Sequence, residues 1–294
     1  MKKVPFTGSC VALITPFTEN GVDFKKLEEL IEWHIKEGTD AILICGTTGE
    51  ASTMPDEEHR EVLRFAVGKI NKRVHVMAGA GSNDTRHAIE LSQYCEKIGV
   101  DSILSVTPYY NKTTQEGLYQ HFKIIAESVT LPVIIYNVPS RTNLNINPST
   151  LKRLSGIGNI AGVKECNLLQ AAEVFHLCGD DLAVYSGEDG NVVPLLALGG
   201  KGVISVMANI IPRDTHHMVE SFLKGDIETS RGLQLKTVPL IKALFCETSP
   251  IPIKAAMNLM GMNVGKCRMP LVELSEAGMV QLRNAMREYG LIDF

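Results

Sequence analysis

The chain has 294 residues, of which 45% are hydrophobic and 21% are charged, and its formal net charge is −4. A negative balance without any basic run argues against a nucleic-acid partner. No apolar run approaches the roughly 18 residues that a membrane-spanning helix needs, so we expect no membrane partner either.

The seven cysteines are scattered along the chain and include no C-x-x-C pair. An odd number without metal-ligand spacing is typical of reduced core residues, not of a disulfide framework or a zinc site. We therefore expect a cytoplasmic protein.

Short apolar runs alternate with stretches of helical spacing as far as Gly225. The expected strands cover residues 10–15, 41–45, 74–78, 102–106, 132–136, 160–164, 182–186 and 202–206. The expected helices run from Asp23 to Gly38, from Pro55 onward, and over residues 84–98, 114–128, 148–154, 171–177, 189–198 and 213–223.

Alternation of this kind implies parallel strands joined by crossover helices, and the number of units fits a closed (β/α)8 TIM barrel. An open doubly wound sheet is the alternative, but no G-x-G-x-x-G follows the first strand. Helical stretches then follow at residues 227–245, 253–260 and 275–289. We expect an α/β fold with a barrel over residues 1–225 and a C-terminal three-helix appendix over residues 226–294.

Lys164 stands at the end of an expected buried strand, residues 160–164. Burial disfavours the ammonium form and lowers the pKa of a lysine, which makes free amine available near neutral pH. Such an amine attacks ketone carbonyls and forms a Schiff base. A strand-end lysine that only extends its amine to water is the alternative.

The active site of such a barrel lies at the carboxyl ends of the strands. Residues 46–49, Gly-Thr-Thr-Gly, follow the second strand and form either a backbone nest for a small carboxylate or a tight turn. Tyr136 ends the fifth strand and is either a proton carrier or a core tyrosine. Arg141 follows a proline and is either a carboxylate clamp or a surface arginine.

Histidines do not gather at these strand ends. His216 and His217 are adjacent in an expected helix, where side chains about 100° apart make a poor pair of metal ligands. We expect neither a metal nor another cofactor.

Three motifs relate the chain to a known family. They are Gly46-Thr47-Thr48-Gly49-Glu50, Tyr136-Asn137-Val138-Pro139-Ser140-Arg141-Thr142 and Val163-Lys164-Glu165. Together they resemble the pyruvate-dependent class I aldolase superfamily and, within it, the dihydrodipicolinate synthase family, over essentially the whole chain. The resemblance implies condensation of pyruvate with L-aspartate 4-semialdehyde to 4-hydroxy-tetrahydrodipicolinate, in the diaminopimelate route to lysine.

The resemblance also implies catalytic roles. Lys164 would form an imine with pyruvate, and Tyr136, Thr47 and Tyr110 would form a proton relay. In the family, the tyrosine that matches Tyr110 enters from a neighbouring subunit of a homotetramer built from tight dimers. We therefore expect this chain to be a homotetramer. The residues alone leave an alternative, in which Tyr109 and Tyr110 form an exposed aromatic pair at a subunit contact without a catalytic role.

The expected substrate-binding residues are Thr48, Ile204, Arg141 and Gly187. Thr48 and the backbone of Ile204 would hold pyruvate, and Arg141 would bind the carboxylate of the aldehyde substrate. Gly187, which follows the seventh strand, is expected at the same site.

The chain departs from the family pattern in places. The loop after Glu165 looks about two residues short, and Asn143 stands where glycine is usual. The pocket that binds lysine in inhibited members would use residues of this chain that include Ala51, Ser52, His59, Asn83 and Tyr109. In that pocket Asp56 replaces a histidine and His87 replaces a glutamate. Because the glutamate would pair with the ammonium of the effector, we expect free lysine to inhibit poorly.

Two other functions stay open at this point. One is a different pyruvate aldolase, such as an N-acetylneuraminate or keto-sugar-acid lyase. The other is a non-catalytic pyruvate-binding barrel, which the short loop after Glu165 favours and the presence of Lys164, Tyr136 and Thr47 opposes.

Overall fold

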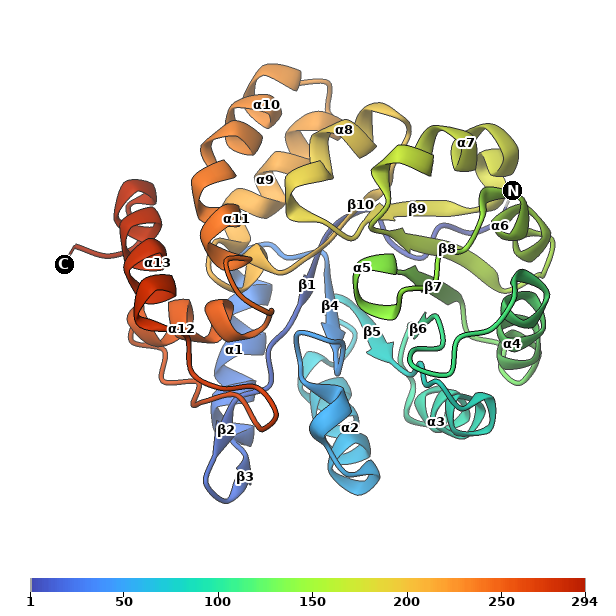
Figure 1. Ribbon diagram of the computed structural model, residues 1–294, viewed down its shortest axis with the longest axis horizontal. Helices are drawn as coiled ribbons and strands as arrows, with labels where there is room; N and C mark the ends of the chain where they lie inside the picture. The colour runs from blue at the N-terminus through green and yellow to red at the C-terminus, as the bar shows by residue number, and fades with distance from the viewer. Residues whose placement is uncertain (1, 294) are drawn as a thin grey trace.

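Eight short parallel strands close into a barrel in the computed structural model, which describes residues 2–293 (Figure 1). In chain order the barrel strands are β1 (Gly8–Ala12), β4 (Ala41–Ile44), β5 (His75–Gly79), β6 (Ser102–Val106), β7 (Val133–Asn137), β8 (Ile160–Glu165), β9 (Ala183–Ser186) and β10 (Gly202–Ser205). β1 pairs with both β4 and β10, so the sheet has no free edge. The expected barrel is confirmed.

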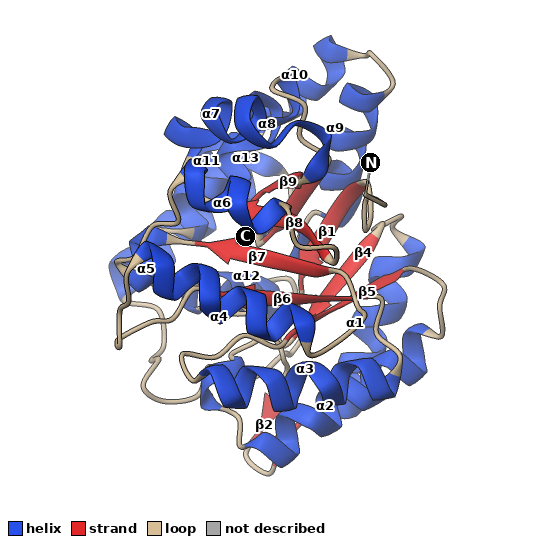
Figure 2. Cartoon of the chain, turned by 90° about the vertical axis from the view of Figure 1, so that its right-hand side faces the viewer, coloured by secondary structure: helices blue, strands red, loops and turns tan. Residues whose placement is uncertain are grey.

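Helices cover the outside of the barrel, as Figure 2 shows. Those of the barrel units are α1 (Phe24–Lys36), α2 (Asp56–Ile70), α3 (Thr85–Ile98), α4 (Gln115–Glu127), α5 (Pro139–Thr142), α6 (Pro148–Ser155), α7 (Leu168–Cys178), α8 (Val192–Ala197) and α9 (Pro212–Leu223). Asp23 caps α1 as expected, because its side chain accepts a hydrogen bond from the Lys26 amide. The short helix α5 and a small hairpin of β2 (Phe17–Thr18) and β3 (Gly21–Val22) were not expected.

The first strand ends earlier than its apolar run suggests. It was expected over residues 10–15, but the parallel ladder stops at Ala12. The Ile14 amide instead donates to the side chain of Asn209, at 3.1 Å. Backbone groups of a buried segment need a partner, and here a distant side chain supplies it.

The chain after Gly225 is helical as expected, but it holds α10 (Ile227–Lys236), α11 (Val238–Leu244), α12 (Ile251–Leu259) and α13 (Glu276–Tyr289). The stretch expected as one helix over residues 227–245 is therefore two helices. Pro239 lies in the first turn of α11, and a proline without an N–H cannot continue the hydrogen bonding of α10. No helix among residues 2–293 is long and apolar enough to cross a membrane.

Side chains of the strands point alternately into and out of the barrel. The inner cluster includes Leu43, Met77, Leu104, Tyr136 and Ile204. The outer cluster joins strand and helix residues, such as Val163, to Leu244, Ile253 and Met257 of the C-terminal helices. We propose that residues 226–294 are a helical region attached to the barrel of residues 1–225 and share its core.

Leu244→Ala tests this shared core. Leu244 is completely buried, so its truncation should lower the free energy of unfolding by about 2–5 kcal/mol. Chemical denaturation followed by circular dichroism should show the whole molecule unfolding in one weakened transition. Leu235→Ala, on a side chain that is 63% exposed, is the matched control and should have little effect. A second transition, with the barrel unchanged, would show two separate folding units.

Candidate active site

Lys164 and Tyr136 face each other inside the barrel at the ends of adjacent strands. The register of β7 and β8 pairs Tyr136 with Lys164, so both side chains point inward. The Lys164 amine lies 4.3 Å from the centre of the Tyr136 ring, and only 5% of the lysine is exposed. Burial lowers the pKa of Lys164, and the nearby groups of Cys166 and Glu188 oppose this only in part. Burial also raises the pKa of the Tyr136 phenol, which therefore stays protonated.

The loop after β4 brings two threonines to the same rim. The amide of Glu50 donates to the carbonyl of Thr47 at 3.1 Å, which closes a turn over residues 47–50. Thr48 is buried within this turn, whereas Thr47 is exposed toward a cavity. A Cβ atom at Gly49 would lie 3.0 Å from the Leu13 carbonyl oxygen, so glycine relieves a tight contact in this turn.

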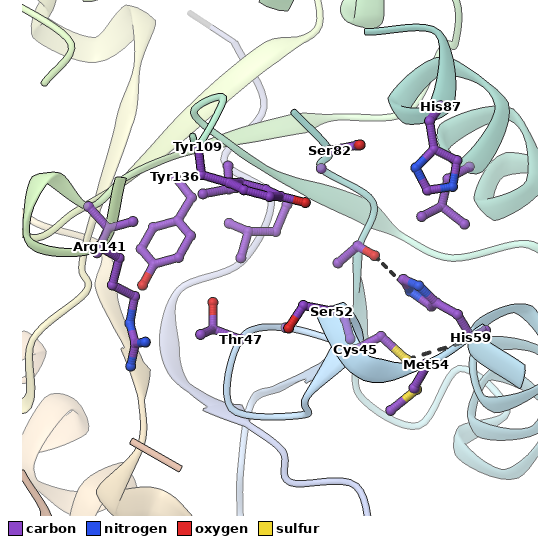
Figure 3. A pocket seen from close by; sticks show the side chains of 18 of the residues that line it. Cys45, Thr47, Ser52, Met54, His59, Ser82, His87, Tyr109, Tyr136 and Arg141 are labelled. Atoms are coloured by element: carbon purple, nitrogen blue, oxygen red, sulfur yellow. Dashed lines mark hydrogen bonds between the residues drawn. The ribbon is translucent and has the colours of Figure 1, made fainter. Parts of the chain in front are cut away.

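The cavity has a volume of about 420 Å³ and reaches across the rim. Tyr136, Thr47 and Arg141 lie at one end of it, and His59 and His87 lie at the other (Figure 3). The residues that line this cavity do not include Lys164, Thr48, Ile204 or Gly187.

Arg141 reaches the cavity from helix α5. This helix is capped by Asn143, whose φ of 50° is a left-handed conformation that glycine and asparagine adopt readily. The Arg141 guanidinium donates to the Ser249 carbonyl at 3.0 Å. A segment just before α12 thus orients this arginine.

Gly187 has no side chain and therefore lets Cys166 and Lys164 pack directly against its backbone. A Cβ atom there would lie 2.4 Å from the Cys166 sulfur and 3.2 Å from Lys164 Cε, so any larger residue would press on both side chains. Burial raises the pKa of the Cys166 thiol to about 12, which keeps the thiol neutral. Ile204 is also buried against the barrel interior.

Comparison with known proteins agrees with this arrangement. The sequence model of the dihydrodipicolinate synthetase family matches residues 5–289 of the chain. The chain belongs to this family.

Individual members of the family are similar over their full length. The 4-hydroxy-tetrahydrodipicolinate synthase of Acetivibrio thermocellus is 64% identical, with 99% of this chain and 100% of the relative covered. A crystal structure of a dihydrodipicolinate synthase has a TM-score of 0.95 at 49% identity, covering 98% of this chain and 100% of that one. The enzyme from Acinetobacter baumannii complexed with pyruvate has a TM-score of 0.95 at 44% identity, covering 98% and 100%.

Tyr110 is the one expected relay residue that the single chain does not bring to the others. Its side chain is 95% exposed, and its backbone has a φ of 69°, which is unusual for a residue other than glycine. Asn83 donates to the carbonyl of the neighbouring Tyr109 at 3.2 Å and so supports this loop. The aromatic ring of Tyr110 is therefore exposed to solvent in the single chain.

Most of the residues expected in a lysine pocket line this cavity, where Tyr109 lies beside Tyr136 and His59 lies at the opposite end (Figure 3). Those that line it are Ala51, Ser52, His59 and Tyr109, whereas Asn83 does not. His87 Nε2 lies 3.1 Å from both carboxylate oxygens of Asp56, so this acid already has a partner. Poor inhibition by lysine stays a prediction. Within residues 2–293 there is no group of three or more His, Cys, Asp or Glu side chains that could hold a metal ion.

Glu165 organises a buried polar network that the motifs did not reveal. Its carboxylate accepts hydrogen bonds from the Asn137 side chain at 2.9 and 3.1 Å, the Asn167 amide at 2.7 Å and Gln170 Nε2 at 2.9 Å. Asn145 donates to Gln170 at 2.8 Å, which adds the loop after α5 to the network. The short loop after Lys164 is therefore held by side chains. A glutamate that follows a buried strand-end lysine was the only sequence signal for it.

The network predicts how stability depends on pH. Burial raises the pKa of Glu165 from 4.5 to about 7, against the opposing effect of its hydrogen bonds. An acid whose pKa is raised by folding stabilises the folded state fully at pH values below its pKa in the unfolded chain. This stabilisation is lost as the pH rises through the pKa of the folded state. At about 1.4 kcal/mol per pKa unit, the loss between pH 4.5 and 8 should be on the order of 3 kcal/mol.

Urea denaturation of the parent and of Glu165→Gln at several pH values measures this effect. The difference between their free energies of unfolding should change over that range, since other titrating groups contribute equally to both proteins. Glu173→Gln, on an exposed side chain of α7, is the control. Its free energy of unfolding should differ from that of the parent by the same amount at every pH. A constant difference for Glu165→Gln as well would contradict the assignment.

Proposed function

We propose that this protein condenses pyruvate with L-aspartate 4-semialdehyde to 4-hydroxy-tetrahydrodipicolinate, through an imine on Lys164. The observation that carries the proposal is the buried amine of Lys164, with its lowered pKa, beside the phenol of Tyr136. It occurs in a chain that is 64% identical to a curated 4-hydroxy-tetrahydrodipicolinate synthase. The seven cysteines are all free, in keeping with a cytoplasmic site for this step of lysine biosynthesis.

Imine formation makes use of the depressed pKa. The neutral amine of Lys164 attacks the ketone carbon of pyruvate, and the resulting carbinolamine loses water. The protonated phenol of Tyr136 and the hydroxyl of Thr47 transfer the protons that these steps need. Thr48 and the Ile204 backbone hold the carboxylate of pyruvate.

The second substrate reacts with the enamine that forms from this imine. Loss of a methyl proton makes the pyruvate carbon nucleophilic, and it attacks the aldehyde carbon of aspartate semialdehyde. Arg141 binds the carboxylate of that substrate, because a guanidinium pairs with a carboxylate through two parallel hydrogen bonds. The amine of the bound substrate then displaces Lys164 as the ring closes, which frees the enzyme.

Trapping the imine tests the assignment of Lys164. Pyruvate followed by borohydride should add a stable pyruvate-derived mass to the peptide that contains Lys164, as measured by mass spectrometry. Lys164→Ala should show no such addition, and a coupled assay with aspartate semialdehyde should find activity only in the parent. Labelling of another lysine would refute the mechanism. Labelling of Lys164 without turnover of aspartate semialdehyde would instead favour a different pyruvate aldolase.

We also propose that the protein is a homotetramer of tight dimers, in which Tyr110 completes the proton relay of a neighbouring subunit. The proposal is supported by the exposure of Tyr109 and Tyr110, 39% and 95%, since exposed adjacent aromatic residues are enriched at interfaces.

Subunit mixing tests the role of Tyr110. Inactive Tyr110→Phe protomers mixed with inactive Lys164→Ala protomers should regain activity, because each mixed dimer contains one complete site. Tyr136→Phe mixed with Lys164→Ala is the matched control and should stay inactive, since Tyr136 and Lys164 belong to one chain. Absence of recovery after subunit exchange has been verified by native mass spectrometry would place the relay within a single subunit.

A further inference from the structure

A buried ion pair links the C-terminal helices to the loop that carries Thr47 and Thr48. The Lys254 amine on α12 lies 2.7 Å from Glu50 Oε1, and the two side chains are 2% and 0% exposed. The same amine donates to the Lys266 carbonyl at 3.0 Å and lies 4.3 Å from the centre of the Phe17 ring. A charge taken out of water at this depth needs a partner, and each residue supplies that partner for the other.

The second oxygen of Glu50 is also engaged by the C-terminal region. Glu50 Oε2 accepts a hydrogen bond from the Arg268 amide at 2.8 Å. The Arg268 guanidinium in turn pairs with Glu58 on α2 and lies 3.9 Å from the centre of the Phe17 ring. The carboxylate of Glu50 is thus held from two directions by residues that follow the barrel in the sequence.

The position of Glu50 determines the shape of the threonine loop. Its backbone has a φ of 55°, a left-handed conformation that costs energy for a residue with a side chain. The same residue donates its amide to Thr47 and accepts, through its carbonyl, a hydrogen bond from the Thr53 amide at 3.0 Å. Side-chain contacts that fix Glu50 therefore fix the turn in which Thr48 is buried and Thr47 faces the cavity.

We infer that Glu50 and Lys254 are positioning residues for pyruvate, which act through the turn of Thr47 and Thr48 without touching the substrate. The inference rests on the proposed function, in which these threonines bind pyruvate. It assigns the C-terminal helices a part in substrate binding. It also predicts different effects on the two substrates. Arg141, which binds the second substrate in the proposed function, is held by a different contact, the carbonyl of Ser249.

Steady-state kinetics of Glu50→Gln and Lys254→Met, with each substrate varied in turn, tests the inference. The KM for pyruvate should rise at least about tenfold, since a hydrogen bond to a carboxylate contributes one decade of binding or more. The KM for aspartate semialdehyde should stay within about twofold of the parent. At saturating pyruvate, borohydride trapping should still label Lys164 completely in every folded molecule.

The matched control is Lys266→Met, in the same region. It makes the same chemical change, but the Lys266 side chain is 74% exposed and pairs with the exposed Glu273. Both KM values of this variant should equal those of the parent. Because a single substitution leaves one buried charge unpaired and can prevent folding, the double variant Glu50→Gln/Lys254→Met is included. It carries no unpaired charge, and it too should bind pyruvate weakly.

The outcomes separate the possible failures. An unchanged KM for pyruvate in the double variant, or an equal rise in both KM values, would overturn the inference. A lower kcat that only follows the fraction of folded protein, with both KM values unchanged, would show a purely structural role and also overturn it. If the parent itself forms no imine with pyruvate, the proposed function fails instead.

Discussion

The burial of the Lys164 amine is the constraint on which the site depends. An amine in water is protonated at neutral pH and cannot attack a carbonyl, so the protein must remove it from water. Closure of the barrel does this, because the Lys164 side chain points into its interior and only 5% of the residue stays exposed. The parallel arrangement of the strands also places Tyr136 and the threonine loop at the same rim.

Two buried lysines in this chain show how a partner decides their chemistry. Burial lowers the pKa of Lys254 as well, but the carboxylate of Glu50, 2.7 Å from its amine, opposes this effect and stabilises the charged form. Among the described residues, no carboxylate lies within ion-pairing distance of Lys164, although Glu165 is next to it in the sequence. The alternation of a strand turns Glu165 to the opposite face, where amide groups of Asn137 and Gln170 occupy its oxygens. The amine of Lys164 is thus kept apart from the carboxylate that would favour its charged form.

The C-terminal helices belong to the same physical system. They share an apolar core with the barrel helices, they hold Glu50, and the segment before α12 orients Arg141. The loop that carries Thr47 and Thr48 and the helix that carries Arg141 are therefore both supported by residues outside the alternating units. The loops at the carboxyl ends of barrel strands are fixed by the strands only where they begin, and helices added to the barrel supply further contacts that hold them.

Much of this was determined by the sequence alone. The alternation of apolar runs and helical spacing predicted the barrel, because the two periods are local properties of a segment. The rule that parallel strands present their carboxyl ends together then placed Lys164, Tyr136 and Thr47 at one rim, and the motifs around them identified the family. The end of the first strand at Ala12 and the pairing of His87 with Asp56 were decided only in three dimensions. So were the network of Glu165 and the ion pair of Glu50 with Lys254. Each of these joins residues far apart in the chain, and which distant side chain satisfies a buried polar group depends on packing, not on local pattern.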